Sequence, residues 1–166
     1  MDKDPESRSV DANTVDVVQA LKDRPAVVEW LYAQANAARW GLSRGHFAAA
    51  LERSAKKRLA SGAFTAPQLE EYLGALHLED LALASACAEG CEAAWEHFVT
   101  TFRGYLRAAA AAILRCKAGS ADACDLADSL FSELYGLAGG KGAERSLFRY
   151  FQGRSSLKTW LRAVLA

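Results

Sequence analysis

The fold is decided by a strongly amphipathic stretch, residues 122–135, which reads Asp-Ala-Cys-Asp-Leu-Ala-Asp-Ser-Leu-Phe-Ser-Glu-Leu-Tyr. Apolar side chains recur at three- and four-residue steps here and just beyond: Ala123, Leu126, Ala127, Leu130, Phe131, Leu134 and Leu137. Because an α-helix turns once in about 3.6 residues, these positions share one face. The pattern predicts a helix that buries this face and exposes its acidic side.

Helical periodicity continues over most of the 166 residues on either side of this stretch. Prolines are few, alanine is frequent, and few segments alternate apolar and polar residues as half-buried strands do. A capping box at Thr65 and Gln68 marks one helix start. Helices are expected within residues 25–41, 43–61, 65–76, 78–88, 95–113, 123–137 and 157–165. We therefore expect an all-α helical bundle, preceded by a small helical extension.

The charge of the chain is zero overall but unevenly divided. Residues 1–99 carry 10 Lys and Arg against 15 Asp and Glu, a net −5, and residues 100–166 carry 10 against 5, a net +5. A basic C-terminal third favours an approach to nucleic acid. No apolar run is long enough to span a bilayer, and no signal peptide is evident, so a cytoplasmic protein without a membrane partner is expected.

Catalytic and metal-binding motifs are not evident. The sequence has neither a GxxxxGK[ST] phosphate loop nor an HExxH zinc motif, so we expect no enzymatic activity and no cofactor. The cysteines, Cys87, Cys91, Cys116 and Cys124, leave two interpretations open. They are zinc ligands if they converge, or buried reduced thiols in helices. The absence of a CxxC pair favours buried thiols and no metal.

Three segments follow one another in a fixed order within residues 77–166. In the first, a short helix stops at Gly90 and Ala94-Trp95 opens a long one; the second is the amphipathic stretch itself, with Asp125, Leu126 and Phe131. The third reads Tyr150-Phe-Gln-Gly-Arg-Ser-Ser-Leu-Lys-Thr-Trp-Leu161. Together they resemble region 2 of extracytoplasmic-function sigma factors, of the sigma-70 family. The second segment resembles region 2.2, although Asp128-Ser129 replaces the usual Gln-Glu pair, and the third resembles region 2.3.

The resemblance implies a transcription initiation factor. Its region 2.2 helix docks on a coiled coil in the largest subunit of core RNA polymerase, and an anti-sigma factor is a further implied partner. The residues assigned to the polymerase contact are Asp125, Leu126, Asp128, Ser129, Ser132 and Glu133.

The resemblance to region 2.3 implies melting of the promoter −10 element around flipped bases. The residues assigned to DNA are Arg149, Tyr150, Phe151, Arg154, Ser155, Ser156, Lys158 and Thr159. Trp160 is expected mainly in the core, and Ser155 is a natural N-cap.

The resemblance covers only part of the chain. Residues 1–10 are expected to be a flexible tail, and residues 11–76 a helical extension of unknown role. Three roles are open for the extension: packing, a lid over the polymerase-binding face, or a nucleic-acid contact through Arg53, Lys56, Lys57 and Arg58. The family's region 2.4 and region 4 do not follow residue 166, so a fragment or a natural truncation is expected.

Two other functional interpretations remain. One is a sigma-like helical interaction module or regulator that engages only a protein partner. The other, less supported, is a metal- or ligand-binding helical bundle.

Because region 2.4 reads much of the −10 element, residues 1–166 are expected to bind a −10 single strand weakly or without sequence preference. A gel-shift titration with −10 and scrambled strands measures this. Tight binding to the −10 strand alone contradicts it.

Overall fold

The computed structural model describes residues 16–59, 64–136 and 146–166, and these residues are all-helical, with no strand among them. The expected tail at 1–10, the first residues of the expected extension (11–15) and Leu137 lie outside the described residues. The described helices are α1 (Val17–Asp23), α2 (Pro25–Gln34), η1 (Ala37–Trp40), α3 (Arg44–Leu59), α4 (Ala66–Gly74), α5 (Leu78–Ala88), α6 (Glu92–Leu114), α7 (Ala121–Tyr135), η4 (Leu147–Tyr150) and α8 (Leu157–Leu165). The all-α prediction is confirmed.

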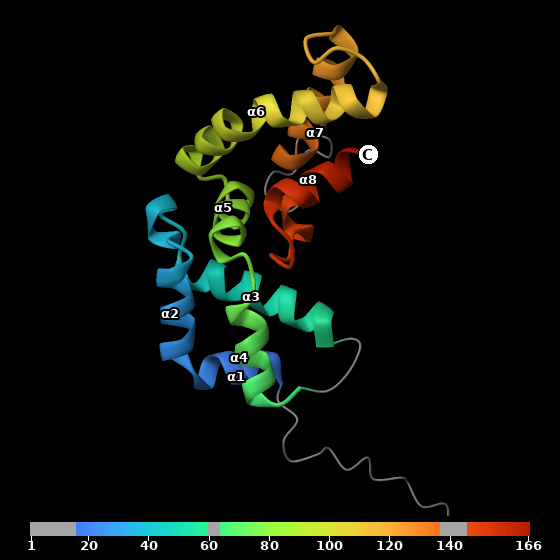
Figure 1. The fold of residues 1–166 in the computed structure, drawn as a ribbon. Helices are drawn as coiled ribbons and strands as arrows, with labels where there is room; N and C mark the ends of the chain where they lie inside the picture. Colours follow the sequence, from blue (N-terminus) through green and yellow to red (C-terminus); the bar gives the residue numbers. More distant parts are fainter. Residues whose placement is uncertain (1–15, 60–63, 137–145) are drawn as a thin grey trace, which may run out of the picture.

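Helix α5 lies at the centre of the molecule (Figure 1). Only Glu79 and Asp80 escape burial among its residues, because α2, α3 and η1 pack on one part of it and α6, α7, α8 and η4 on the rest. Most of its buried residues are small or medium-sized, with alanines at 82, 84, 86 and 88. Small side chains let several neighbouring helices approach one short helix closely. A helix that is apolar on all sides is buried, whereas an amphipathic one lies at the surface.

The N-terminal helices follow local sequence signals, with two differences from expectation. The capping box is present: Thr65 accepts from the Gln68 N–H, and the Gln68 side chain accepts from the Thr65 N–H. Helix α1, capped by Asp16, was not expected. The helix expected to run from Pro25 to Gly41 instead ends at Gln34, because Asn36 adopts a left-handed conformation (φ 52°) and the turn η1 follows.

The C-terminal helices pack around α6. Helix α6 runs across the upper part of the view in Figure 1, with α7 crossing it and packed against it, and α8 below. Phe98 and Leu106 of α6 are fully buried, as are Leu134 of α7 and Leu161 of α8. Of the apolar face expected for α7, Ala123, Ala127, Leu130 and Leu134 are buried, and Leu126 and Phe131 are half-buried.

Residues 16–76 and 77–166 share one hydrophobic core. Two hydrogen bonds between described residues join the two parts: Ser54 Oγ–H donates to the Gln152 carbonyl (2.7 Å), and Cys91 Sγ–H donates to the Trp40 carbonyl (2.7 Å). The described part of the extension therefore packs against the described residues of 77–166, and packing is the first of the three roles expected for it.

Gly153, in the loop before α8, lies against the start of α5. Its φ of +74° is left-handed, and a Cβ built there would lie 3.4 Å from Leu81 Cβ. Glycine adopts this conformation without the steric cost that other residues incur. The loop is thus held against α5 where its backbone accepts from His77.

Replacing Ser54 with alanine tests the connection between the two parts. Ser54 is fully buried, and its hydroxyl also lies 2.8 Å from the Tyr72 hydroxyl. Ser54→Ala leaves the Gln152 carbonyl without this donor, so the free energy of unfolding should fall by about 1–2 kcal/mol. Urea unfolding measures it, with exposed Ser129→Ala as control. Equal stability of the two variants contradicts the proposed connection.

Candidate functional site

A shallow pocket of about 380 Å³ lies where the end of α3 meets the loop between η4 and α8. It is lined by Lys57, Tyr150, Phe151, Gln152, Arg154, Ser155 and Trp160. Four of these residues were predicted to contact DNA: Tyr150, Phe151, Arg154 and Ser155. The structure therefore brings half of the predicted DNA-binding residues together and adds Lys57 from the extension.

The aromatic residues of the pocket differ in what they expose. Tyr150 is 68% exposed and offers a ring face to solvent. Phe151 is only 5% exposed and packs on Trp160, with ring centroids 5.4 Å apart. Phe151 therefore lines the pocket from the core, and of the two aromatic residues assigned to DNA only Tyr150 has a ring that is largely exposed. Trp160, expected mainly in the core, is half-buried and forms part of the pocket wall.

The polar groups at the start of α8 are largely engaged. Ser156, not Ser155 as expected, is the N-cap: its Oγ accepts from the Thr159 N–H at 3.2 Å and donates to Thr159 Oγ1 at 2.9 Å. The Leu157 N–H donates to Asp80 Oδ2 at 2.9 Å. Ser155 Oγ donates to the Ser156 carbonyl and still lines the pocket. Of the predicted serines, Ser155 is therefore the better placed for a ligand.

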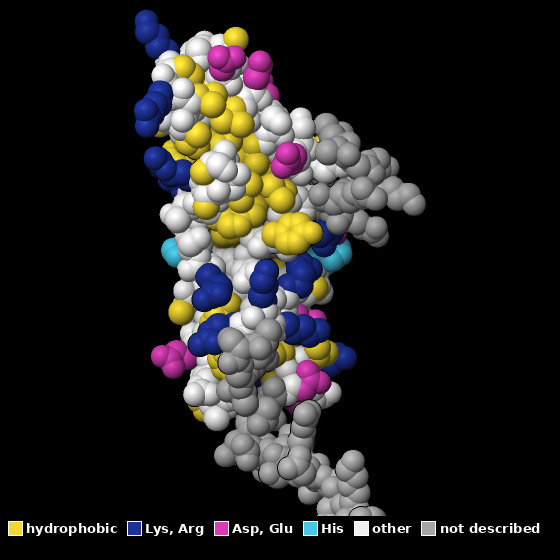
Figure 2. All heavy atoms as spheres, turned by 90° about the vertical axis from the view of Figure 1, so that its right-hand side faces the viewer, with side chains coloured by type: hydrophobic (Ala, Val, Ile, Leu, Met, Phe, Trp, Pro, Cys, Tyr) yellow, Lys and Arg dark blue, Asp and Glu magenta, His cyan; other side chains and the backbone are white. Residues whose placement is uncertain are grey.

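Cations gather beside the pocket. Figure 2 looks at the side that carries α8 and the end of α3, and shows Lys and Arg side chains in a band below a broad hydrophobic area. The pKa of Arg53 is lowered by burial and then by the charge of Arg149. Arg149 donates to Glu89 Oε1 at 3.1 Å, and His46 Nε2 lies 3.5 Å from Glu89 Oε2. Clustered cations attract phosphates and other anions.

The remaining predicted DNA contacts lie apart from the pocket lining. Lys158 and Thr159 are exposed on α8, and the Lys158 ammonium lies 4.7 Å from the centre of the Tyr105 ring. Arg149 belongs to the neighbouring ion-pair cluster. Arg149, Lys158 and Thr159 are therefore not among the residues that line the pocket.

Helix α7 presents the predicted acidic face. Asp125, Asp128, Ser129, Ser132 and Glu133 are all exposed, and none of the three acids forms an ion pair with a described residue. Leu126, the sixth residue predicted to contact the polymerase, is half-buried and packs against the core. Ser120 caps the helix by accepting from the Ala123 N–H, and Gly136 (φ 85°) ends it. The face can thus engage a partner without first breaking an internal ion pair.

The cysteines do not assemble into a site. Within residues 16–59, 64–136 and 146–166, no group of three or more His, Cys, Asp and Glu could hold a metal ion. Cys87 is buried, but Cys116 is exposed in the turn between α6 and α7, which corrects the expectation that all four thiols are buried. In the same described ranges, no helix is long and apolar enough to cross a membrane.

Comparison with protein-family models, with curated proteins and with solved structures finds no match to this chain. The functional assignment therefore depends on the residues and their geometry.

The cysteine environments predict an order of alkylation. Burial, followed by the nearby Cys91, raises the pKa of Cys87 from 9.0 to about 12. Its thiolate fraction at pH 8 is then lower by about a thousandfold, and the thiolate is the reactive form. Iodoacetamide followed by peptide mass spectrometry should show Cys116 modified first and Cys87 last. Comparable rates at both sites contradict this order.

Proposed function

We propose that this chain is a sigma-70-type module that binds core RNA polymerase through α7 and contacts single-stranded promoter DNA at the basic aromatic pocket. The observation that carries the proposal is the convergence of Lys57, Tyr150, Arg154 and Ser155 on one pocket. They come from two segments that are far apart in the sequence. Neither segment alone provides the cations, the exposed ring and the hydroxyl together.

The pocket has the groups that unpaired nucleotides require. Binding of single strands combines cations along the phosphates with aromatic faces on which bases stack. Lys57 and Arg154 provide charge, Tyr150 provides the exposed ring, and the Ser155 hydroxyl can bond a base edge or phosphate oxygen. Arg53 lies one turn before Lys57 on α3 and adds positive charge to the same helix face. The buried Phe151 and the half-buried Trp160 form part of the pocket wall.

The polymerase-binding part of the proposal is supported by the exposed face of α7. A helix that docks on a partner needs one face in its own core and the other available, and α7 meets both conditions. The described helices of the extension pack on one another and on α5. The elements that pack most on α7 are α5, α6, α8 and η4, none of which belongs to the extension. This arrangement gives no support to the lid interpretation of the extension.

Two paired substitutions separate the two activities. Asp125→Lys with Asp128→Lys should abolish retention of the chain on immobilised core polymerase and leave single-strand binding intact. Lys57→Glu with Arg154→Glu should weaken single-strand binding by at least about tenfold and reduce its salt dependence, because phosphate contacts are lost. Fluorescence anisotropy with labelled oligonucleotides at several salt concentrations measures the second effect.

The matched control is Lys22→Glu with Lys117→Glu, which makes the same change in net charge at two exposed residues outside the pocket lining. It should reduce single-strand affinity by far less. Equal losses in both pairs would show a general charge effect and overturn the pocket assignment. Wild-type protein that is not retained by core polymerase would leave the interaction-module interpretation as the better one, with α7 facing another protein.

A further inference from the structure

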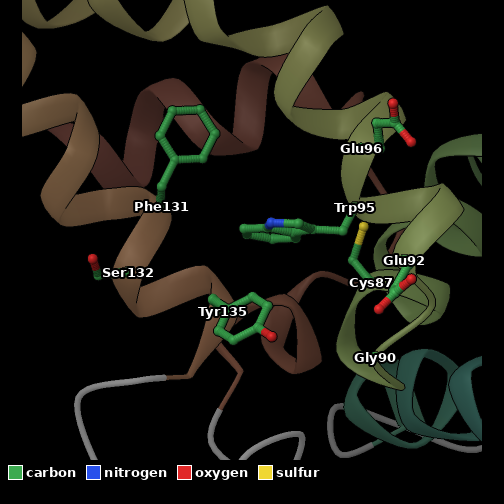
Figure 3. A pocket seen from close by; sticks show the side chains of 8 residues that line it. All are labelled: Cys87, Gly90, Glu92, Trp95, Glu96, Phe131, Ser132 and Tyr135. Atoms are coloured by element: carbon green, nitrogen blue, oxygen red, sulfur yellow. The ribbon is translucent and has the colours of Figure 1, made fainter.

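A second and larger cleft lies away from the basic pocket, where the end of α5, the start of α6 and the end of α7 meet (Figure 3). Its volume is about 600 Å³, within the range of roughly 300–1,000 Å³ that is usual for ligand sites. The lining residues are Cys87, Gly90, Glu92, Trp95, Glu96, Phe131, Ser132 and Tyr135. Ser132 is the only one that also belongs to the acidic face of α7.

Three aromatic rings form the walls of this cleft. The Trp95 and Tyr135 ring centroids lie 5.1 Å apart at an interplanar angle of 63°, and those of Trp95 and Phe131 lie 6.5 Å apart at 85°. Figure 3 shows Trp95 between the other two rings. Tyr135 is 51% exposed although it is a large aromatic residue. Ring faces carry partial negative charge, so steeply angled rings around an open space suit a cation.

The rim of the cleft is acidic. Glu92 and Glu96 lie one turn apart on α6, both are exposed, and neither forms an ion pair with a described residue. No Lys or Arg is among the lining residues. Helix α7 also ends here, at Tyr135, with no basic residue in its last turn, and a helix C-terminus favours positive charge. The N-terminus of α6 carries partial positive charge, but the C-terminus of α5, with partial negative charge, lies beside it and offsets this charge.

We propose that this cleft binds an arginine side chain of a partner polypeptide. The guanidinium lies against the Trp95 and Tyr135 rings and pairs with Glu92, while the aliphatic stem covers Phe131. The Glu96 carboxylate, which points away from the rings in Figure 3, adds negative charge at the rim. A planar, weakly hydrated guanidinium stacks on rings and pairs with carboxylates better than a compact ammonium does. An apolar side chain would contact the rings, but it would also remove water from two carboxylates without providing a counter-ion, which disfavours its binding. The site requires neither polymerase nor DNA, so it does not depend on the function proposed above.

Peptide arrays provide the test. The purified 166-residue chain is applied at low salt to four sets of nine-residue peptides. The central residue is Arg, Lys, Leu or Glu, and the residues on both sides of it are randomised. The Arg-centred set should retain the most protein, followed by Lys, and the Leu and Glu sets should retain little. Equal retention on the Leu-centred set would show an apolar groove and overturn the proposal, as would retention on none of the sets.

Substitutions confirm where the peptides bind. Glu92→Gln with Glu96→Gln, and separately Tyr135→Ala, should each reduce the signal on the Arg-centred set by at least tenfold. Matched controls are Glu71→Gln with Glu79→Gln, which removes two negative charges outside the cleft, and Trp30→Ala, which removes an exposed ring from α2. Controls that lose as much signal as the cleft variants would assign the retention to general charge or stickiness and overturn the proposal. Circular dichroism confirms that each variant is folded.

Discussion

The burial of α5 on all sides is the constraint on which the rest of the structure depends. A helix of this kind has no polar side to turn towards water, so it folds stably only when other helices surround it. Helices α2 and α3 cover one part and α6, α7 and α8 another, and a single hydrophobic core results. Glu79 and Asp80 are the two residues of α5 that are not buried, and Asp80 accepts a hydrogen bond from the Leu157 N–H in the first turn of α8. The central helix thereby positions both functional surfaces.

Local signals in the sequence were sufficient for most of the helices. The capping box at Thr65 and the amphipathic face of α7 depend on residues three or four positions apart, and such spacing can be recognised without knowledge of the fold. The break at Asn36 could not be recognised so easily, because left-handed conformations are uncommon for residues other than glycine. Helix α1 was missed because seven residues contain too few turns for a clear period.

The candidate sites were harder to predict, because they depend on contacts between distant segments. The aromatic run at 147–151 predicts rings near a loop, but not that Phe151 faces inward while Tyr150 faces solvent. Lys57 reaches the pocket only because α3 packs on α5. In the acidic cleft, Trp95 and Phe131 occupy helical positions typical of core residues. The one local signal was a pair of acidic residues, Glu92 and Glu96, that lie four positions apart with Trp95 between them in the sequence.

The closeness of Arg53 and Arg149 has a thermodynamic consequence. Arg53 comes from α3 and Arg149 from η4, so their mutual repulsion acts across the junction between the N-terminal helices and the rest of the chain. Glu89 lies at the same junction, where its carboxylate accepts from Arg149 and lies 3.5 Å from His46 Nε2 of α3. These side chains are not neighbours in the unfolded chain, so both the repulsion and the Glu89 contacts that offset it exist only when the junction is closed. Dissolved salt screens both effects, so the electrostatic part of the junction's stability varies with ionic strength.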